Sequence, residues 1–290
     1  MHKSFRRKKE FTSKTRPITP SLLLKIRQKF IQKGWAIEDD HENTCFQRYC
    51  SMISGLVNDE QENFIFDLTD RFLTIEDREY ERYFFYSVKN LLRAVQCKNI
   101  YVIPMIAPED IGYSVKSGGR VAYLLKGTKI KTFSEYKQQT IKLYENIERL
   151  PDDLSKDEII ILTDDFMGSG DTAIKAINHI FKIKPNLRYA KIIIICIAAL
   201  RTGVELLESR GIDVYATVIL NKGISDYYEP SDKIFYLSLM DQIENRIKAP
   251  YNYKLGYKQS EALISLIRPP NNTFPVFWLD NKIAKSPFPR

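Results

Sequence analysis

Apolar positions follow two different patterns along this chain. Up to about residue 97 they recur at helical spacing, as in Leu22, Ile26 and Phe30 and again in Phe84 and Val88. This spacing predicts amphipathic helices. From residue 99 onward, short runs of consecutive apolar residues alternate with helical patterns. Such runs predict strands that are buried on both faces, as in a parallel sheet.

The predicted strands lie at residues 99–107, 158–163, 191–199 and 213–220. Strands that alternate with helices are typical of an α/β fold with right-handed crossovers. We also expect a strand at residues 120–126, after the turn Lys116-Ser117-Gly118-Gly119, and an amphipathic helix at residues 134–150. The fold class is therefore α/β, with a parallel sheet flanked by helices.

This pattern divides the chain into four parts. We expect a basic flexible arm at residues 1–20, a helical region at 21–97, an α/β core at 98–245 and a tail at 246–290. Burial of Phe277 and Trp278 would fix the tail to the core.

The charge, the apolar segments and the cysteines limit what kind of protein this can be. The net charge of +8 comes largely from the arm, for which we favour a solvated terminus over a contact with nucleic acid or another anionic partner. No apolar segment is long enough for a signal peptide core or a membrane span. The four cysteines form no C-x-x-C pair and the three histidines are scattered, so we expect a cytoplasmic protein without a disulfide framework or zinc site.

Candidate chemistry follows the strand at residues 158–163. Asp164 and Asp165 come at its carboxyl end, where open α/β sheets bind ligands. Next comes the turn Gly168-Ser169-Gly170-Asp171-Thr172, which opens a helix whose N-terminus favours an anion. The hydroxyls of Ser169 and Thr172 suit a phosphate, and the two carboxylates suit a sugar diol or a sugar-bound magnesium ion. Together they fit ribose 5-phosphate.

These residues resemble the phosphoribosyl pyrophosphate (PRPP) loop of the type I phosphoribosyltransferases. That loop has two acidic residues, three variable positions and Ser/Thr-Gly-x-Ser/Thr, here Asp164, Asp165 and then residues 169–172. The resemblance implies that the acids bind the ribose hydroxyls and that the turn binds the 5-phosphate. It also implies PRPP as ligand, Mg²⁺ bound near Asp164 and Asp165, and chemistry at the anomeric carbon that releases pyrophosphate.

Two further segments acquire roles only through this resemblance. Lys116, Ser117 and Gly118 match the composition of the family's pyrophosphate loop, although a plain hairpin turn would look the same. Lys222 and Asp226, with the neighbouring Tyr227, stand where the family has a flexible hood over the active site. An exposed polar loop is the alternative reading of that segment.

As a whole, the chain resembles phosphoribosyltransferase-like proteins of bacterial anti-phage operons. Their features are a helical N-terminal part, a K-S-G turn, the D-D…S-G-x-T loop, a K-G-I-S-D segment and a P-N-N-T-x-P-x-x-W tail, all present here in that order. The resemblance implies an effector, or toxin, with partner proteins such as an ATPase or a reverse transcriptase.

Other interpretations remain open at this point. The letters GSGDTA also fit the dinucleotide fingerprint, but Asp164 and Asp165 would repel a pyrophosphate there. A strand-turn-helix without a ligand is the other alternative. A P-loop is excluded because no Gly-Lys-Ser/Thr follows.

Two positions depart from the family pattern. Gly168 stands where many base-salvage members carry an acid, and Asp171 puts a carboxylate inside the phosphate turn, from which we expect it to face solvent. Two classes of function therefore stay open. One is an enzyme acting at the anomeric carbon, and the other is an inactive sensor or toxin subunit that binds the same ligand.

Overall fold

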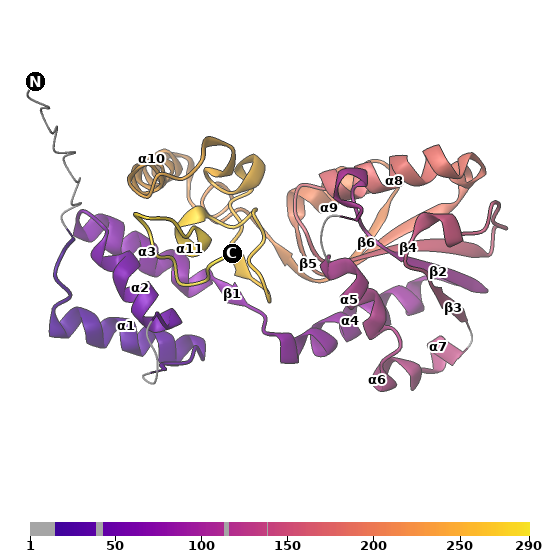
Figure 1. Cartoon of the computed structure of the whole chain (residues 1–290), viewed down its shortest axis with the longest axis horizontal. Coiled ribbons are helices and arrows are strands. Elements are labelled where there is room, and N and C mark those ends of the chain that lie inside the picture. The colour runs from indigo at the N-terminus through magenta and orange to yellow at the C-terminus, as the bar shows by residue number, and fades with distance from the viewer. Residues whose placement is uncertain (1–14, 39–42, 113–115, 138) are drawn as a thin grey trace, which may run out of the picture.

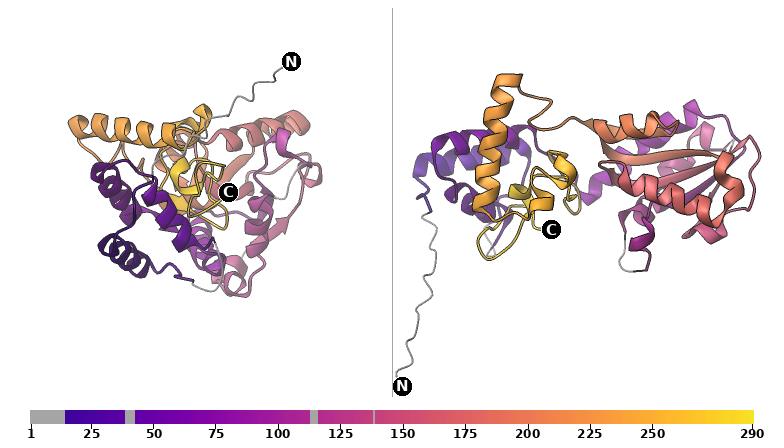
Figure 2. Two further views of the ribbon diagram at one scale, coloured as in Figure 1. Left: turned by 60° about the vertical axis from the view of Figure 1, so that its left-hand side comes forward. Right: turned by 90° about the horizontal axis from the view of Figure 1, so that it is seen from above.

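The computed structural model describes residues 15–38, 43–112, 116–137 and 139–290. Most of the predicted basic arm lies outside these residues. Two units lie side by side along the long axis of the molecule, as Figures 1 and 2 show. We call them the α/β unit and the helical unit. Among the described residues, no helix combines the length and the apolar character needed to cross a membrane.

The α/β unit is built on a five-stranded parallel sheet with strand order β3-β2-β4-β5-β6. The strands are β2 (Asn99–Pro104), β3 (Thr140–Leu143), β4 (Glu158–Met167), β5 (Lys191–Leu200) and β6 (Asp213–Leu220). The predicted parallel α/β sheet is confirmed. From β2 the chain adds β3 on one side, and β4 then pairs with the other side of β2. The strand order therefore switches between β2 and β4, where α/β sheets form ligand crevices.

Helices cover both faces of this sheet (Figure 1). The helices α4 (Tyr80–Ala94) and α5 (Ser117–Leu124) pack on one face, and α8 (Asp171–Ile183) and α9 (Arg201–Glu208) on the other. In β4, Ile159 and Ile161 join the first cluster, and Ile160 and Leu162 join the second. Because both faces are buried there, residues 159–162 of the strand are all apolar instead of alternating.

The helical unit combines the two ends of the chain. It contains α1 (Pro20–Lys33), α2 (Cys45–Ser54), α3 (Asp59–Arg71), α10 (Pro230–Arg246) and α11 (Pro275–Trp278). We call residues 247–290 the C-terminal tail. Phe277 and Trp278 of the tail are buried as predicted, but Phe277 packs among the side chains of the helical unit and not on the α/β core. Its ring lies 4.5 Å from that of Phe72, which follows α3. A parallel pair of short strands, β1 (Leu73–Thr74) and β7 (Ile264–Ser265), also joins the tail to the N-terminal part.

Two predicted elements are wrong. The segment expected as a strand at residues 120–126 belongs mainly to helix α5, because Val121, Ala122 and Leu125 lie on one helical face against the sheet. The helix expected at residues 134–150 is divided into a short α7 (Ser134–Lys137) and the edge strand β3, with α6 (Thr128–Lys131) before them. Thr140-Ile141-Lys142-Leu143 alternates exposed and half-buried positions, as an edge strand does.

Substitutions at two adjacent glycines of α5 would measure how closely this helix packs on the sheet. A Cβ added at Gly118 would lie 2.5 Å from the Thr163 carbonyl oxygen, whereas one at Gly119 would meet nothing nearer than Pro104 Cγ at 3.9 Å. We expect Gly118→Ala to destabilise the protein by about 1–3 kcal/mol through overpacking. Gly119→Ala should stabilise it by roughly 0.5–1 kcal/mol because alanine favours a helix. Urea unfolding measures both; equal effects would contradict this packing.

Candidate functional site

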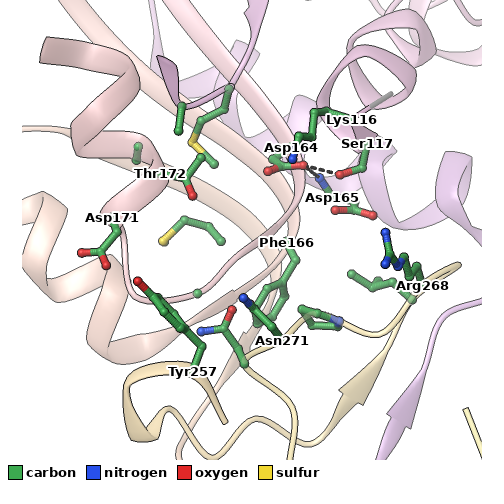
Figure 3. Close-up of a pocket in the computed structure, with 18 of the residues that line it drawn as sticks. Lys116, Ser117, Asp164, Asp165, Phe166, Asp171, Thr172, Tyr257, Arg268 and Asn271 are labelled. Atoms are coloured by element: carbon green, nitrogen blue, oxygen red, sulfur yellow. Dashed lines mark hydrogen bonds between the residues drawn. The ribbon is translucent and has the colours of Figure 1, made fainter. Parts of the chain in front are cut away.

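A pocket of about 580 Å³ opens beyond the carboxyl end of β4. Figure 3 shows Lys116, Ser117 and the acid pair Asp164 and Asp165 at one part of it, with Tyr257 and Asn271 of the tail across from them. The α/β unit provides Lys116, Ser117, Asp164, Asp165 and residues 166–173, and the tail provides Tyr257, Arg268, Asn271, Asn272 and Arg290. The pocket thus lies between the two units.

The acid pair stands where β4 extends beyond its neighbour. The last paired residues of β2 and β4 are Pro104 and Thr163, so Asp164 is the first residue past the end of β2. The Ser117 hydroxyl donates to Asp164 Oδ1 at 2.6 Å, and the backbone N–H of Asp165 donates to the same oxygen at 2.9 Å. The Tyr80 hydroxyl of α4 donates to Asp165 Oδ2 at 2.9 Å. Both carboxyl groups are therefore fixed by donors from neighbouring elements.

The proximity of the two carboxyl groups has an electrostatic consequence. Burial raises the pKa of the Asp164 carboxyl well above its ordinary value of 3.8, and the negative charge of Asp165 raises it further. The hydrogen bonds from Ser117 and the Asp165 backbone act in the opposite direction. A cation or a set of hydroxyl donors placed against the pair would favour its ionised form.

The turn at residues 168–172, which we call the phosphate turn after its expected ligand, leads directly into α8. Gly170 caps this helix in the left-handed region with φ of 83°, which favours glycine. The first backbone N–H groups of a helix have no partner within it, and here they border the pocket beside Ser169 and Thr172. This end of the pocket therefore offers backbone and hydroxyl donors together with the positive end of a helix dipole.

Asn272 of the tail packs directly against Gly168. A Cβ at Gly168 would overlap the Asn272 side chain, which is buried and donates from Nδ2 to the Ser260 hydroxyl at 3.0 Å. A side chain at position 168 would therefore displace the Asn272 amide. An amide from the tail occupies the space beside the turn.

Asp171 was expected to face solvent, but in the structure it is only partly exposed and forms an ion pair. Its side chain is 28% exposed, and its carboxylate lies 2.5 Å from the Lys258 ammonium of the tail. This ion pair neutralises the carboxylate that would otherwise repel a phosphate in the turn.

The structure brings only some of the other predicted site residues to the pocket. Lys116 and Ser117 line it, although the Lys116 ammonium also pairs with Asp110 at 3.1 Å. Gly118 does not line the pocket and packs against the Thr163 carbonyl of β4 and against Pro104 and Met105 at the end of β2. Its small size serves helix packing.

Lys222 and Asp226 are not among the residues that line the pocket. The Lys222 backbone N–H donates to Asp226 Oδ2 at 2.9 Å, and the Lys222 ammonium lies 3.9 Å from Glu261. The neighbouring Tyr227 ring is covered by the guanidinium of Arg71, 3.5 Å from the ring centre. This segment therefore links β6 to the helical unit, while the tail covers the pocket.

The part of the tail that faces the pocket has an unusual backbone. Leu255, Lys258, Gln259 and Glu261 all have positive φ, between 51° and 56°. The buried Glu244 accepts from the backbone N–H of Leu255 at 2.9 Å, and Glu261 accepts from that of Ser225 at 2.7 Å. Strained backbone of this kind persists only where surrounding contacts hold it, and it is enriched at ligand sites.

A magnesium ion is compatible with part of this site. Asp164 and Asp165 offer hard oxygen ligands of the kind that Mg²⁺ prefers. In the part of the chain that the structure describes, no group of three or more His, Cys, Asp or Glu side chains could hold a metal. Phosphate oxygens and water would therefore have to complete the coordination.

The raised pKa of Asp164 leads to a prediction about stability. The unfolded chain loses this proton near pH 3.8, whereas the folded chain retains it to higher pH. The stability gained from the proton is complete below pH 3.8 and is lost as pH rises through the folded pKa. Asp164→Asn keeps the acceptor oxygen without the charge. We expect its Tm at pH 7, without ligand, to exceed that of the wild type by about 2–4 °C.

Thermal unfolding between pH 4 and pH 8 tests this expectation, and the gain should shrink toward pH 4. Asp213→Asn is the matched control, because Asp213 pairs with Lys191 near the opposite end of the sheet. A gain at pH 7 that is equal in the two variants would show that the acid pair is not the cause.

Several solved structures are distantly similar to this chain. A hypothetical protein from Neisseria gonorrhoeae with bound ppGpp is 11% identical with a TM-score of 0.34, covering 59% of this chain and 97% of the other. For the AQ2163 protein from Aquifex aeolicus the identity is 12%, the TM-score 0.31 and the coverage 64% and 87%. The APRTase from Giardia lamblia complexed with 9-deazaadenine is 13% identical with a TM-score of 0.28, covering 47% of this chain and 77% of the other. No functional conclusion follows from such weak likenesses.

A comparison of sequences with family models is more informative. No curated protein matches the chain. The model of the family described as PRTase-CE matches residues 59–290, which include the whole α/β unit, the acid pair, the phosphate turn and the tail. The chain therefore belongs to the PRTase-CE family and is phosphoribosyltransferase-like.

Proposed function

We propose that this chain binds PRPP or a related ribose-phosphate nucleotide through Asp164, Asp165 and the turn at residues 168–172, and cleaves or transfers at the ribose anomeric carbon. One observation carries the proposal. A single pocket is lined by a pair of carboxyl groups and, beside them, by a helix N-terminus with two hydroxyl side chains. The carboxyl groups match the hydroxyls of a ribose, and the helix N-terminus with its two hydroxyl side chains matches a phosphate at C5.

The chemistry of each part supports this orientation of the ligand. The N-terminus of α8, with Ser169 and Thr172, would bind the 5-phosphate, because Lys258 neutralises the nearby Asp171. Asp164 and Asp165 would accept hydrogen bonds from the ribose hydroxyls. These bonds would favour the ionised carboxyl groups and would offset the repulsion between their charges.

Catalysis would depend on charge stabilisation at the anomeric carbon. Asp164 and Asp165, together with ligand oxygens, would hold a magnesium ion, whose positive charge would stabilise a departing pyrophosphate. The carboxylates would lie near the positive charge that develops on the ribose ring as the bond to C1 breaks, and would stabilise it.

The alternative is a binding subunit without turnover. Gly168 and the neighbouring Asn272 favour this reading, because neither can take a proton from an incoming base at the position where many family members have an acid. In this case the chain would act as a ligand-gated sensor or toxin subunit under the control of partner proteins.

The biological setting is part of the same proposal. The five segments shared with proteins of anti-phage operons support a role as a cytoplasmic defence effector. We propose an ATPase or a reverse transcriptase as its partner, and the basic N-terminal arm as the segment that could contact nucleic acid.

A melting screen with PRPP, nucleotides and Mg²⁺ tests binding, because a ligand stabilises the folded protein whether or not it reacts. We expect PRPP with Mg²⁺ to raise the Tm, and pyrophosphate release to follow if the chain is an enzyme. Asp164→Asn combined with Asp165→Asn should abolish both effects. The control Asp213→Asn should retain both.

The possible results separate the alternatives. Stabilisation without any product would support the binding subunit, and no stabilisation by any ribose phosphate would refute the proposal. A shift that survives in the doubly substituted variant would place the ligand elsewhere.

The defence role is tested in bacteria that express the chain with its operon neighbours. We expect the wild type to lower phage plating efficiency, and Asp164→Asn with Asp165→Asn to restore it at equal protein abundance. Equal protection by the two forms would separate the pocket from any defence activity.

A further inference from the structure

The cationic side chains that line the pocket fall into two groups. Three of them, on the α/β unit, already contact a carboxylate: Lys116 with Asp110, Arg120 with Asp77, and Lys175 with Glu109. The other two, Arg268 and Arg290, belong to the tail. Neither forms an ion pair with a carboxylate among the residues that the structure describes. The tail therefore brings two uncompensated positive charges to the rim of the pocket.

These two charges also affect each other. Partial burial lowers the pKa of Arg290, and the positive charge of Arg268 lowers it further. The Arg290 guanidinium lies 5.8 Å from the centre of the buried Trp278 ring, and its backbone N–H donates to the Trp278 carbonyl at 3.3 Å. Packing against the helical unit thus holds this arginine near a like charge. An anion between the two would remove the repulsion.

A chain of hydrogen bonds sets the position of Arg268 relative to the acid pair. The preceding residue, Ile267, donates its backbone N–H to the Tyr80 hydroxyl at 3.2 Å, and that hydroxyl donates to Asp165 at 2.9 Å. In Figure 3, Arg268 lies near Asp165, whereas Asp171 and Thr172 lie on the other side of the pocket. The arginine and the phosphate turn therefore flank the acid pair.

We propose that Arg268 and Arg290 form a second anion site, which binds a phosphate-type group on the C1 side of the ribose. This inference rests on the proposed function, in which the turn at residues 168–172 holds the 5-phosphate. The pocket then selects a ribose with phosphate groups at both ends, and the tail recognises the C1 end. Guanidinium groups suit this role because they bind phosphate oxygens with paired N–H donors.

The position of the tail strengthens this assignment. The Ser117 hydroxyl is already bonded to Asp164 and the Lys116 ammonium is paired with Asp110, so both polar side chains of the segment predicted as the pyrophosphate loop are already engaged. The tail supplies the missing positive charge. Its strained loop and buried anchors hold it in place before any ligand arrives, which reduces the entropic cost of binding.

Calorimetry with three ligands tests the second site: PRPP with Mg²⁺, ribose 5-phosphate, and free pyrophosphate with Mg²⁺. We expect Arg268→Ala combined with Arg290→Ala to weaken PRPP binding by about 10- to 100-fold, the usual effect of losing charge-assisted hydrogen bonds. Ribose 5-phosphate binding should stay within about 2-fold of the wild type, since that ligand lacks the C1 group. Free pyrophosphate should lose affinity for the arginine variant together with PRPP, and pyrophosphate binding that is equal in the wild type and the variant would refute the second site.

Two further variants separate charge from folding. Arg188→Ala with Arg210→Ala removes the same charge from exposed positions outside the pocket and should leave all affinities unchanged. Arg268→Lys with Arg290→Lys keeps the charge without the paired donors and should recover part of the lost PRPP affinity. Unchanged melting curves would confirm that each variant is folded.

The outcomes distinguish this inference from the proposed function. If the wild type binds PRPP and the arginine variant binds it equally well, the second site is refuted while the proposed function stands. An equal loss of PRPP and ribose 5-phosphate would also refute it, because the arginines would then contact the 5-phosphate or support the tail. If the wild type binds neither ribose phosphate, both proposals fail.

Discussion

Two adjacent carboxyl groups at the end of a buried strand impose the main electrostatic constraint on this structure. Burial and the negative charge of Asp165 both raise the pKa of the Asp164 carboxyl, so its ionised form depends on donors or cations around it. The protein supplies one donor from α5, through Ser117, and one from α4, through Tyr80. Tyr80 in turn accepts a hydrogen bond from Ile267 of the tail. Compensation of the acid pair therefore connects the α/β unit to the opposite end of the chain.

This connection explains why the pocket is composite. The α/β unit provides the acids and the helix N-terminus, and the tail provides the facing wall together with Lys258, Arg268 and Asn272. In the α/β unit alone, the Asp171 carboxylate would repel a phosphate in the turn, and Gly168 would leave the space of the usual acid empty. Lys258 neutralises the first, and Asn272 fills the space beside the second. The departures from the family pattern are thus adapted to the tail.

The sequence predicted the strands and the turn whose residues are contiguous in the chain. The apolar runs of β4, β5 and β6 and the glycine turn before α8 are contiguous and were placed correctly. The segment around Val121 was misassigned because a short apolar run fits a strand and a buried helix equally well. The contribution of the tail to the pocket was not predicted, because it depends on contacts between distant parts of the sequence. Tyr80 accepts from the backbone of Ile267, next to Arg268, and donates to Asp165. The P-N-N-T motif was the only local sign of it.

The pairing of charges in the pocket also narrows the chemistry. Five carboxylates line it within the described residues, and three of them contact a lysine: Glu109, Asp110 and Asp171. The other two are the acid pair, whose raised pKa at Asp164 makes it the best proton acceptor there. Ligand hydroxyls or a cation that favour the ionised pair would lower that pKa and release the proton. Binding would therefore leave Asp164 as a weakly basic carboxylate whose oxygens are already engaged by the ligand, and so as a poor acceptor for a proton from an incoming base. This favours a reaction limited by departure of an anion from C1, or binding alone, over deprotonation of an incoming base.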